Sequence, residues 1–184
     1  MVKIGFVGCG GIAMEHLKHL RTMGDVKIAG VCDANAARAK AFAGEAGSEA
    51  FADHTALYDK AKPDAVYVAV PPFAHGAIEE EAAARGIHLF VEKPVAIDMA
   101  TAARVSGAIK RAGILSAGGY CYRYCDTIDT ARALLKGRAV SLVHGTWVGD
   151  LPPKAWWRRR DQSGGQVLEQ TTPLFDMVRY LCGP

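Results

Sequence analysis

The chain has 184 residues, of which 50% are hydrophobic and 22% are charged, and its formal net charge is +3 at pH 7. These values are ordinary for a globular protein, and the dispersed lysines and arginines do not indicate a nucleic-acid-binding patch. The longest purely apolar runs, such as residues 65–70, are as long as a strand and too short to span a bilayer. The five cysteines are scattered and lack zinc-ligand spacing, which predicts reduced thiols, a cytoplasmic protein and no metal site.

The chain opens with the pattern of a strand, a tight glycine turn and a helix, over residues 2–7, 8–10 and 11–21. In this context the glycines predict a dinucleotide-binding turn. Gly8 permits the turn, and Gly10 lets the backbone approach a pyrophosphate. The amide groups that open the helix then face the phosphates. The predicted cofactor contacts in this turn are Gly8, Gly10, Gly11 and Ile12.

An acidic residue, Asp33, follows a second apolar run at residues 26–32. At that place a carboxylate can accept hydrogen bonds from the ribose hydroxyls of the adenosine. The same carboxylate repels a 2′-phosphate, so NAD is favoured over NADP as the cofactor. The alternative is a glycine-rich turn followed by a solvated aspartate.

Apolar runs and helical patterns alternate through the first 118 residues. Strands are expected at 2–7, 26–32, 65–70, 87–91 and 114–118, and helices at 11–21, 34–46, 74–85 and 98–112. Such alternation is typical of a parallel sheet that is covered by helices on both faces. We therefore predict an α/β fold with a doubly wound, Rossmann-type dinucleotide-binding domain over residues 1–118.

The character of the chain changes at residues 119–184. The pattern predicts a helix at 126–136, one long strand at 140–148 and a final helical stretch after Gly164-Gly165. A single strand leaves its backbone donors and acceptors unpaired. We therefore expect an incomplete α/β domain with an open sheet, and a homo-oligomer that pairs through that sheet.

Two turns follow strands of the predicted Rossmann sheet at their carboxyl ends. Pro71-Pro72 follows the third long strand, and Glu92-Lys93 follows the next. Doubly wound sheets bind ligands at this edge. Lys93 can sit there beside a nicotinamide and exchange a proton with a hydroxyl; the alternative is an exposed loop lysine.

In this order along the chain, the motifs resemble the glucose-fructose oxidoreductase, inositol dehydrogenase and rhizopine-catabolism (Gfo/Idh/MocA) family of NAD(P)-dependent oxidoreductases. The residues that carry the resemblance are Gly8, Gly10 to Ala13, Asp33, Pro71, Pro72, His75, Glu92 to Pro94, Arg123 and the Gly164-Gly165 pair. The resemblance implies an NAD-binding Rossmann domain followed by an α/β substrate domain. It also implies hydride transfer between nicotinamide and a secondary alcohol carbon of a sugar, polyol or related compound.

The resemblance assigns roles to individual residues. Lys93 matches the lysine that touches both nicotinamide and substrate and is the predicted catalytic residue. Arg123 matches an arginine near cofactor and substrate, while Pro71, Pro72, His75 and Glu92 join the predicted cofactor site. Without the resemblance, Arg123 could be a structural cation in an aromatic patch, and His75 could be a histidine at the start of a helix.

One position departs from the family pattern. The helix after the glycine pair should carry an acid, a histidine or tyrosine four residues later and a second acid three further on; here these are Glu169, Pro173 and Asp176. The two acids can still orient a substrate, or they belong to a solvated face. Pro173 cannot transfer a proton, and it either breaks the helix or, with Thr172 as the cap, begins a shorter one.

The segment Trp156-Trp157 with Arg158 to Arg160 precedes the glycine pair. Aromatic rings beside cations suit a sugar face or an anionic substrate, so Trp157 is predicted to bind substrate. The alternative is a run that is solvated or contacts another subunit.

The sequence leaves three candidate functions. The first is an NAD-dependent sugar or polyol oxidoreductase. The second is a non-catalytic NAD-binding module, which Pro173 favours, and the third is redox-neutral NAD chemistry.

Overall fold

A computed structural model describes residues 1–183 of the chain. Its sheet has six parallel strands in the order β3-β2-β1-β4-β5-β6. The strands are β1 (Val2–Val7), β2 (Val26–Cys32), β3 (Ala50–Phe51), β4 (Ala65–Val68), β5 (His88–Val91) and β6 (Ser116–Gly118). This order reverses direction between β1 and β4, which is the point where Rossmann folds bind dinucleotides. The predicted α/β Rossmann fold is confirmed.

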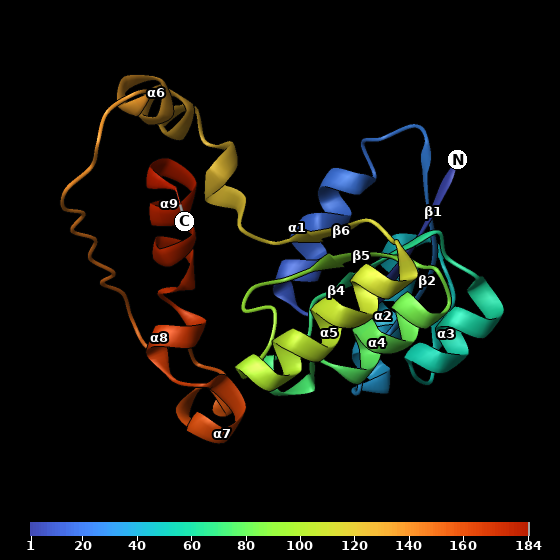
Figure 1. Cartoon of the computed structure of the whole chain (residues 1–184). Coiled ribbons are helices and arrows are strands. Elements are labelled where there is room, and N and C mark those ends of the chain that lie inside the picture. Colours follow the sequence, from blue (N-terminus) through green and yellow to red (C-terminus); the bar gives the residue numbers. More distant parts are fainter. Residues whose placement is uncertain (184) are drawn as a thin grey trace.

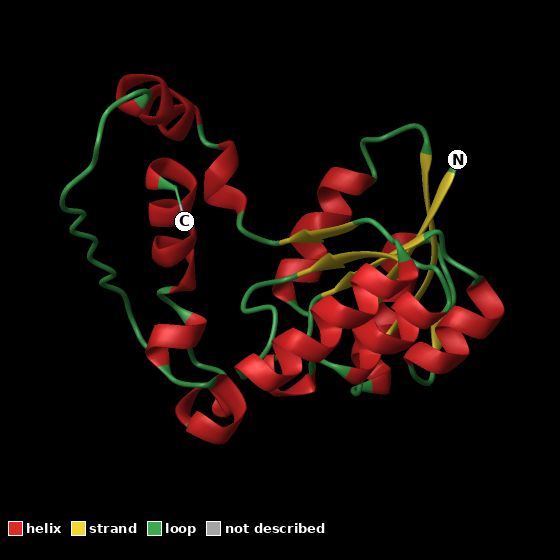
Figure 2. Cartoon of the chain, in the orientation of Figure 1, coloured by secondary structure: helices red, strands yellow, loops and turns green. Residues whose placement is uncertain are grey.

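Helices cover both faces of the sheet (Figures 1 and 2). In the first 118 residues they are α1 (Gly11–Leu20), α2 (Ala36–Ala46), α3 (His54–Ala61), α4 (Ala77–Ala84) and α5 (Met99–Ala112), with the 3₁₀ turn η1 (Pro72–Ala74) before α4. Two separate apolar clusters form the core. One includes Phe6, Leu17 and Phe42, from β1, α1 and α2, and the other includes Leu57 and Ala82, from α3 and α4. Because the central strands β1 and β2 are mostly buried and covered by helices on both sides, their sequences are almost continuously apolar.

The helix boundaries follow local capping chemistry. The Asn35 side chain accepts a hydrogen bond from Arg38 N at the start of α2, and the Asp98 side chain accepts one from Thr101 N at the start of α5. Gly113 ends α5 in the left-handed conformation, with φ of 65°, which glycine adopts without steric cost. These caps place the observed starts one or two residues after the predicted ones.

The regular elements in residues 119–183 are all helices or 3₁₀ turns. They are η2 (Cys121–Tyr124), α6 (Asp126–Leu135), η3 (Ala155–Arg158), α7 (Arg160–Ser163), α8 (Gln166–Glu169) and α9 (Thr172–Cys182). A long irregular segment separates α6 from η3. Figure 1 shows α6 and α9 close together and the segment between α6 and η3 running around the outside of the molecule. None of the helices within residues 1–183 is both long enough and apolar enough to cross a membrane.

The strand predicted at residues 140–148 is wrong, because the structure gives this segment no strand pairing. Its sequence alternates in the manner of a strand, but a strand forms only when a neighbour satisfies its backbone groups. No part of residues 119–183 supplies that neighbour. Leu142 and Val148 are consequently 84% and 90% exposed.

Candidate functional site

The predicted site residues of the Rossmann part meet at one edge of the sheet. Gly8 follows β1, Asp33 follows β2, Pro71 lies beyond β4, and Glu92 follows β5. The strands are parallel, so all four positions lie at their carboxyl ends, on both sides of the reversal between β1 and β4. This edge is where a doubly wound sheet holds its ligand.

The glycine turn has the form that a pyrophosphate requires. Gly8 has φ of 90°, and an added Cβ would lie 2.5 Å from the carbonyl oxygen of Ala69. At Gly10 and Gly11, by contrast, no atom of the described chain lies within 4 Å of an added Cβ. The backbone there borders an open cradle at the N-terminus of α1, which suits the phosphates of NAD. Ile12 is 47% exposed beside it.

Asp33 ties the end of β2 to the glycine turn. Its Oδ2 accepts a hydrogen bond from Cys9 N at 2.8 Å, and its Oδ1 accepts one from Asn35 N at 2.7 Å. Arg38 Nη1 lies 3.8 Å from Oδ2. A carboxylate has about four acceptor sites, so these contacts leave lone pairs for the ribose hydroxyls of a nucleotide.

The turn after β4 rests on a buried histidine and glutamate. Pro72 begins η1 and is buried. In the sequence, Pro71 and Pro72 are followed three residues later by His75. The Nδ1 atom of His75 lies 2.5 Å from Glu79 Oε1. Neither the His75 nor the Glu79 side chain has exposed surface. The imidazole therefore supports the turn from inside the domain. We accordingly propose that His75 assists cofactor binding by supporting this turn and not by touching the cofactor.

Glu92 is held on three sides. Its Oε1 accepts a hydrogen bond from His16 Nε2 at 2.6 Å, and its Oε2 accepts one from Lys93 N at 3.0 Å. Gly119 lies against the carboxylate, and a Cβ there would be 2.8 Å from it. The Glu92 carboxylate therefore packs inside the domain, and its contact with α1 is through His16.

The Lys93 amine reaches across to the second part of the chain. Its Nζ donates to the backbone oxygen of Glu169 at 3.1 Å and lies 3.3 Å from Glu169 Oε1. Glu169 is buried, and its Oε2 accepts a further hydrogen bond from Gln170 Nε2 at 2.9 Å. An amine and a carboxylate 76 residues apart in the sequence thus meet at the edge where the glycine turn lies.

Arg123 and Asp176 form a second pair. Arg123 Nε donates to Asp176 Oδ2 at 2.7 Å, and Nη2 pairs with Oδ1. The guanidinium also lies over the Tyr180 ring, 4.9 Å from its centroid. The hydrogen bond that Arg123 donates to Asp176 raises the pKa of Arg123 above its usual value, so Arg123 stays charged.

The helical stretch after the glycine pair breaks just before Pro173. α8 ends at Glu169, and α9 begins at Thr172 with Pro173 as its second residue. Proline is tolerated in a first turn because its missing amide hydrogen would have no intrahelical acceptor. The predicted shorter helix is confirmed, although its cap is Thr171 rather than Thr172. Glu169 and Asp176 consequently project from different helices, one to Lys93 and one to Arg123.

Trp157 lies inside the second part of the chain. It is 7% exposed, and its ring centroid is 6.3 Å from that of Trp156. The predicted stacking of Trp157 on a substrate remains a proposal that requires the ring to become accessible. Arg159 pairs with Asp161 at 2.7 Å on the exposed side of this segment.

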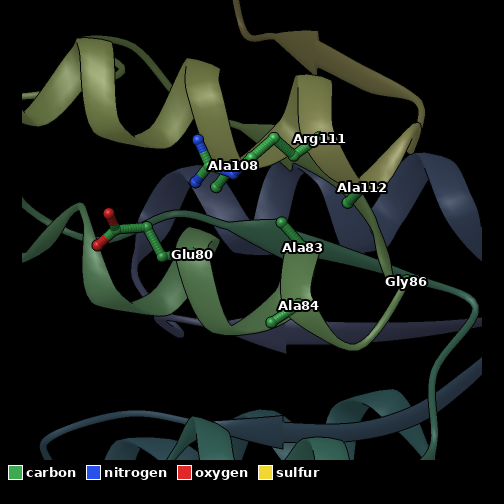
Figure 3. Close-up of a pocket in the computed structure, with 7 residues that line it drawn as sticks. All are labelled: Glu80, Ala83, Ala84, Gly86, Ala108, Arg111 and Ala112. Atoms are coloured by element: carbon green, nitrogen blue, oxygen red, sulfur yellow. The ribbon is translucent and has the colours of Figure 1, made fainter.

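A cavity of about 380 Å³ lies beside the Lys93 turn, between the two parts of the chain. Its walls come from Pro94 to Met99, Ala102 and Tyr120, and from Gly164, Leu168 and Thr172. A larger pocket of about 520 Å³ lies between the ends of α4 and α5 (Figure 3). Those helix ends lie toward the amino edge of the sheet, opposite the glycine turn. Within residues 1–183, no group of three or more His, Cys, Asp or Glu could hold a metal ion.

Comparison with known proteins gives this arrangement a family. Residues 2–119 match the model of an oxidoreductase family with an NAD-binding Rossmann fold, GFO_IDH_MocA. The chain belongs to the Gfo/Idh/MocA family. The resemblance predicted from the motifs is confirmed, and NAD is the cofactor of this family's Rossmann domain.

Relatives of this Gfo/Idh/MocA chain include sugar and polyol dehydrogenases. Glucose-6-phosphate 3-dehydrogenase of Bacillus subtilis (strain 168) is 30% identical, over 98% of this chain and 54% of that protein. Myo-inositol 2-dehydrogenase of Thermotoga maritima is 25% identical, over 99% of this chain and 55% of that protein. The WlbA dehydrogenase of Bordetella pertussis, solved with NADH and UDP-GlcNAcA, shares the fold with a TM-score of 0.89 at 22% identity, over 100% of this chain and 60% of that one. The chain thus spans about half the length of the curated relatives it matches.

Two neighbours of the candidate site residues were not predicted from the sequence. His16 lies on α1 and contacts Glu92, and periodicity alone does not reveal a partner 76 residues away. Glu79 had a local signal, because it lies three residues after the helix cap Gly76 and its Oε2 accepts a hydrogen bond from Gly76 N at 2.7 Å. That spacing is typical of a capping box.

Proposed function

We propose that this chain forms the NAD-binding half of an oxidoreductase that transfers a hydride between nicotinamide and a secondary alcohol carbon of a sugar, polyol or related compound. The observation that carries the proposal is the Lys93 amine, which pairs with Glu169 at the edge of the sheet that holds the glycine turn. The family supports the reaction type, and the names of the relatives support the substrate class.

Each part of the site has a task in this proposal. Gly8, Gly10, Gly11 and Ile12 hold the pyrophosphate at the N-terminus of α1, and Asp33 binds the adenosine ribose. Pro71, Pro72 and Glu92 shape the edge along which the cofactor extends, with His75 beneath them. Because the Asp33 carboxylate repels a 2′-phosphate, the preferred cofactor is NAD rather than NADP.

The chemical step centres on Lys93. NAD, when bound, supplies the hydride acceptor. Lys93 Nζ exchanges a proton with the substrate hydroxyl, and the Glu169 carboxylate at 3.3 Å orients the amine and offers a second proton acceptor. Arg123 and Asp176 orient the substrate, and Trp157 joins them only when its buried ring becomes accessible. This arrangement assigns acid-base chemistry to Lys93 and Glu169, because Pro173 has no ionisable group.

Turnover tests this proposal directly. The chain is incubated with NAD and a panel of polyols, sugars and sugar phosphates, and NADH is followed by absorbance. We expect oxidation of at least one compound, and loss of about 10²-fold or more in rate in Lys93→Ala. Lys110→Ala, which removes an exposed lysine of α5, is the matched control. Binding of NAD without turnover of any compound would overturn the proposal for this chain.

Pro173 favours a second function, an NAD-binding module without activity of its own. The variant Pro173→His restores the proton-transfer residue of the family and separates the two functions. Activity that appears only in this variant would identify the natural chain as a binding module. Activity in the natural chain would exclude that role.

Two further properties are proposed rather than shown. We infer a homo-oligomer formed through residues 140–148, because this apolar segment has no strand partner among residues 1–183. We also infer a cytoplasmic location, because all five cysteines are free thiols.

A further inference from the structure

The contact between His16 and Glu92 joins two regions of the proposed site, the helix α1 and the turn that carries Lys93. His16 is on α1, whose first residues border the cradle for the pyrophosphate. Glu92 is the last residue before Lys93. The hydrogen bond between them, at 2.6 Å, therefore connects α1 directly to the turn that carries Lys93.

The His16 ring is held in place by aromatic neighbours on the sheet. It packs edge-on against Phe90, with centroids 4.9 Å apart, and lies 5.2 Å from the Tyr67 ring. Phe90 and Tyr67 in turn stack on each other at 4.5 Å. A carboxylate can only accept hydrogen bonds, so His16 Nε2 carries the hydrogen and donates it to Glu92. The ring geometry directs this donor toward the Lys93 turn.

Glu92 passes this constraint to the backbone of Lys93. The carboxylate uses Oε1 for His16 and Oε2 for Lys93 N, at 3.0 Å. Gly119 has no side chain, which lets the carboxylate pack against the backbone that follows β6; a Cβ there would lie 2.8 Å from it. The Glu92 side chain is 10% exposed, so losing one partner leaves a largely buried charge poorly satisfied.

We propose that His16 and Glu92 are positioning residues that fix the Lys93 turn relative to α1. They hold the amine where a cofactor bound by the glycine turn presents its nicotinamide. This inference rests on the proposed function, which places Lys93 beside the nicotinamide. It goes further in assigning the placement of Lys93 to a residue of α1. The pair acts on the nicotinamide end of the cofactor and leaves the binding of the ADP-ribose end unchanged.

The affinities for two ligands distinguish this positioning role from a purely structural role in stabilising α1. NADH contains the nicotinamide, whereas ADP-ribose has the same adenosine, pyrophosphate and second ribose without it. Dissociation constants for both are measured by calorimetry on the intact chain. His16→Leu retains apolar packing but removes the donor, His16→Gln retains an amide donor, and Glu92→Gln removes the charge. His19→Leu, which changes an exposed histidine of the same helix, is the control.

We expect His16→Leu and Glu92→Gln to weaken NADH binding by about tenfold, the effect of one charge-assisted hydrogen bond. ADP-ribose binding should stay within about twofold, which also shows that each variant is folded. His16→Gln should recover most of the NADH affinity, and the double variant His16→Leu/Glu92→Gln should be no weaker than the singles because the two residues act as one unit. An equal loss for both ligands, or no loss for NADH, would overturn the inference.

Lys93→Ala in the same assay separates this inference from the proposed function. A selective loss of NADH binding in Lys93→Ala but not in His16→Leu would contradict only the positioning role. No selective loss in Lys93→Ala would contradict the placement of Lys93 beside the nicotinamide and, with it, the inference. Neither measurement requires turnover, so an inactive chain still gives a decisive result.

Discussion

Gly8 and Gly10 are two residues apart in the same turn, yet the structure constrains them differently. Gly8 has a positive φ and lies against the Ala69 carbonyl, so a side chain there meets backbone. Gly10 has φ of −80° and, among residues 1–183, nothing near its Cβ position. The fold therefore requires the first glycine, whereas only the proposed approach of the pyrophosphate requires the second.

This difference predicts opposite outcomes for two alanine substitutions. Gly8→Ala should lower the free energy of unfolding by about 1–3 kcal/mol, the cost of a strained backbone position. Gly10→Ala should leave stability nearly unchanged but weaken NADH binding, because its methyl group enters the cradle. Urea denaturation and NADH titration of both variants check this. Equal destabilisation by the two substitutions would contradict it.

Cys9 lies within the glycine turn and Cys32 ends β2, and both are buried, unlike the three other cysteines. Burial raises the pKa of each thiol to about 12, while Cys121, Cys125 and Cys182 are exposed. At pH 8 we expect a thiol reagent to modify the three exposed cysteines quickly and the buried two only on unfolding. Mass spectrometry of the labelled protein gives the count. Rapid labelling of Cys9 would contradict its placement.

The same two thiols make stability depend on alkaline pH. Their folded-state pKa values lie above the unfolded value of about 9, so the folded state keeps protons that the unfolded chain releases. Their contribution to the free energy of unfolding is therefore complete below about pH 9 and is lost as pH rises from about 9 toward 12. Cys9→Ala/Cys32→Ala should lose less stability than the natural chain between pH 8.5 and 10.5.

At the scale of elements, the junction between η1 and α4 depends on a buried pair. His75 and Glu79 have no exposed side-chain surface, and Glu79 also accepts the amide of Gly76. The pair His54–Glu81, at 3.0 Å, offers a contrast because both side chains are about one quarter exposed.

We expect His75→Ala to lower the free energy of unfolding by about 3 kcal/mol, because it leaves a buried carboxylate without its partner. His54→Ala should cost less than about 1 kcal/mol, as is usual for a surface pair. Chemical denaturation of the two variants compares them. Similar values for both would mean that the His75 pair is accessible to water.

The elements that sequence reasoning found are those with strong local signals. Strands such as β1 and β2 are long and apolar, and the glycine turn and Asp33 predict a nucleotide site from local sequence alone. β3 has only two residues, which is too short to show a period, and α3 was missed although Asp53 accepts a hydrogen bond from Ala56 N as its cap. Pairings across the fold, such as Lys93 with Glu169, depend on tertiary packing and could not be predicted from spacing.

At the scale of the whole molecule, the two parts of the chain meet at Lys93. The amine belongs to the Rossmann part, and its partner Glu169 belongs to the helices that follow. The segment at residues 140–148 runs along the outside of the molecule (Figure 1). Trp147 Nε1 donates to Gln170 Oε1 at 2.7 Å, whereas Leu142 and Val148 are exposed to solvent. An apolar extended segment of this kind can pair edge to edge with a second copy.

We expect the chain to self-associate through this segment, and Leu142→Lys/Val148→Lys to shift it toward monomer. Leu115→Lys is the control, because Leu115 is 72% exposed but lies in the Rossmann part. Sedimentation velocity at several concentrations measures the association. A chain that is monomeric before substitution would contradict the proposed oligomer.

The central claim is that the carboxyl edge of the sheet binds NAD, with Asp33 on the adenosine ribose. Calorimetric titration of the intact chain with NADH and with NADPH tests it most directly. We predict that NADH binds and that NADPH binds at least about tenfold more weakly, because the 2′-phosphate meets the Asp33 carboxylate. No heat with either nucleotide, or tighter binding of NADPH, would contradict the account.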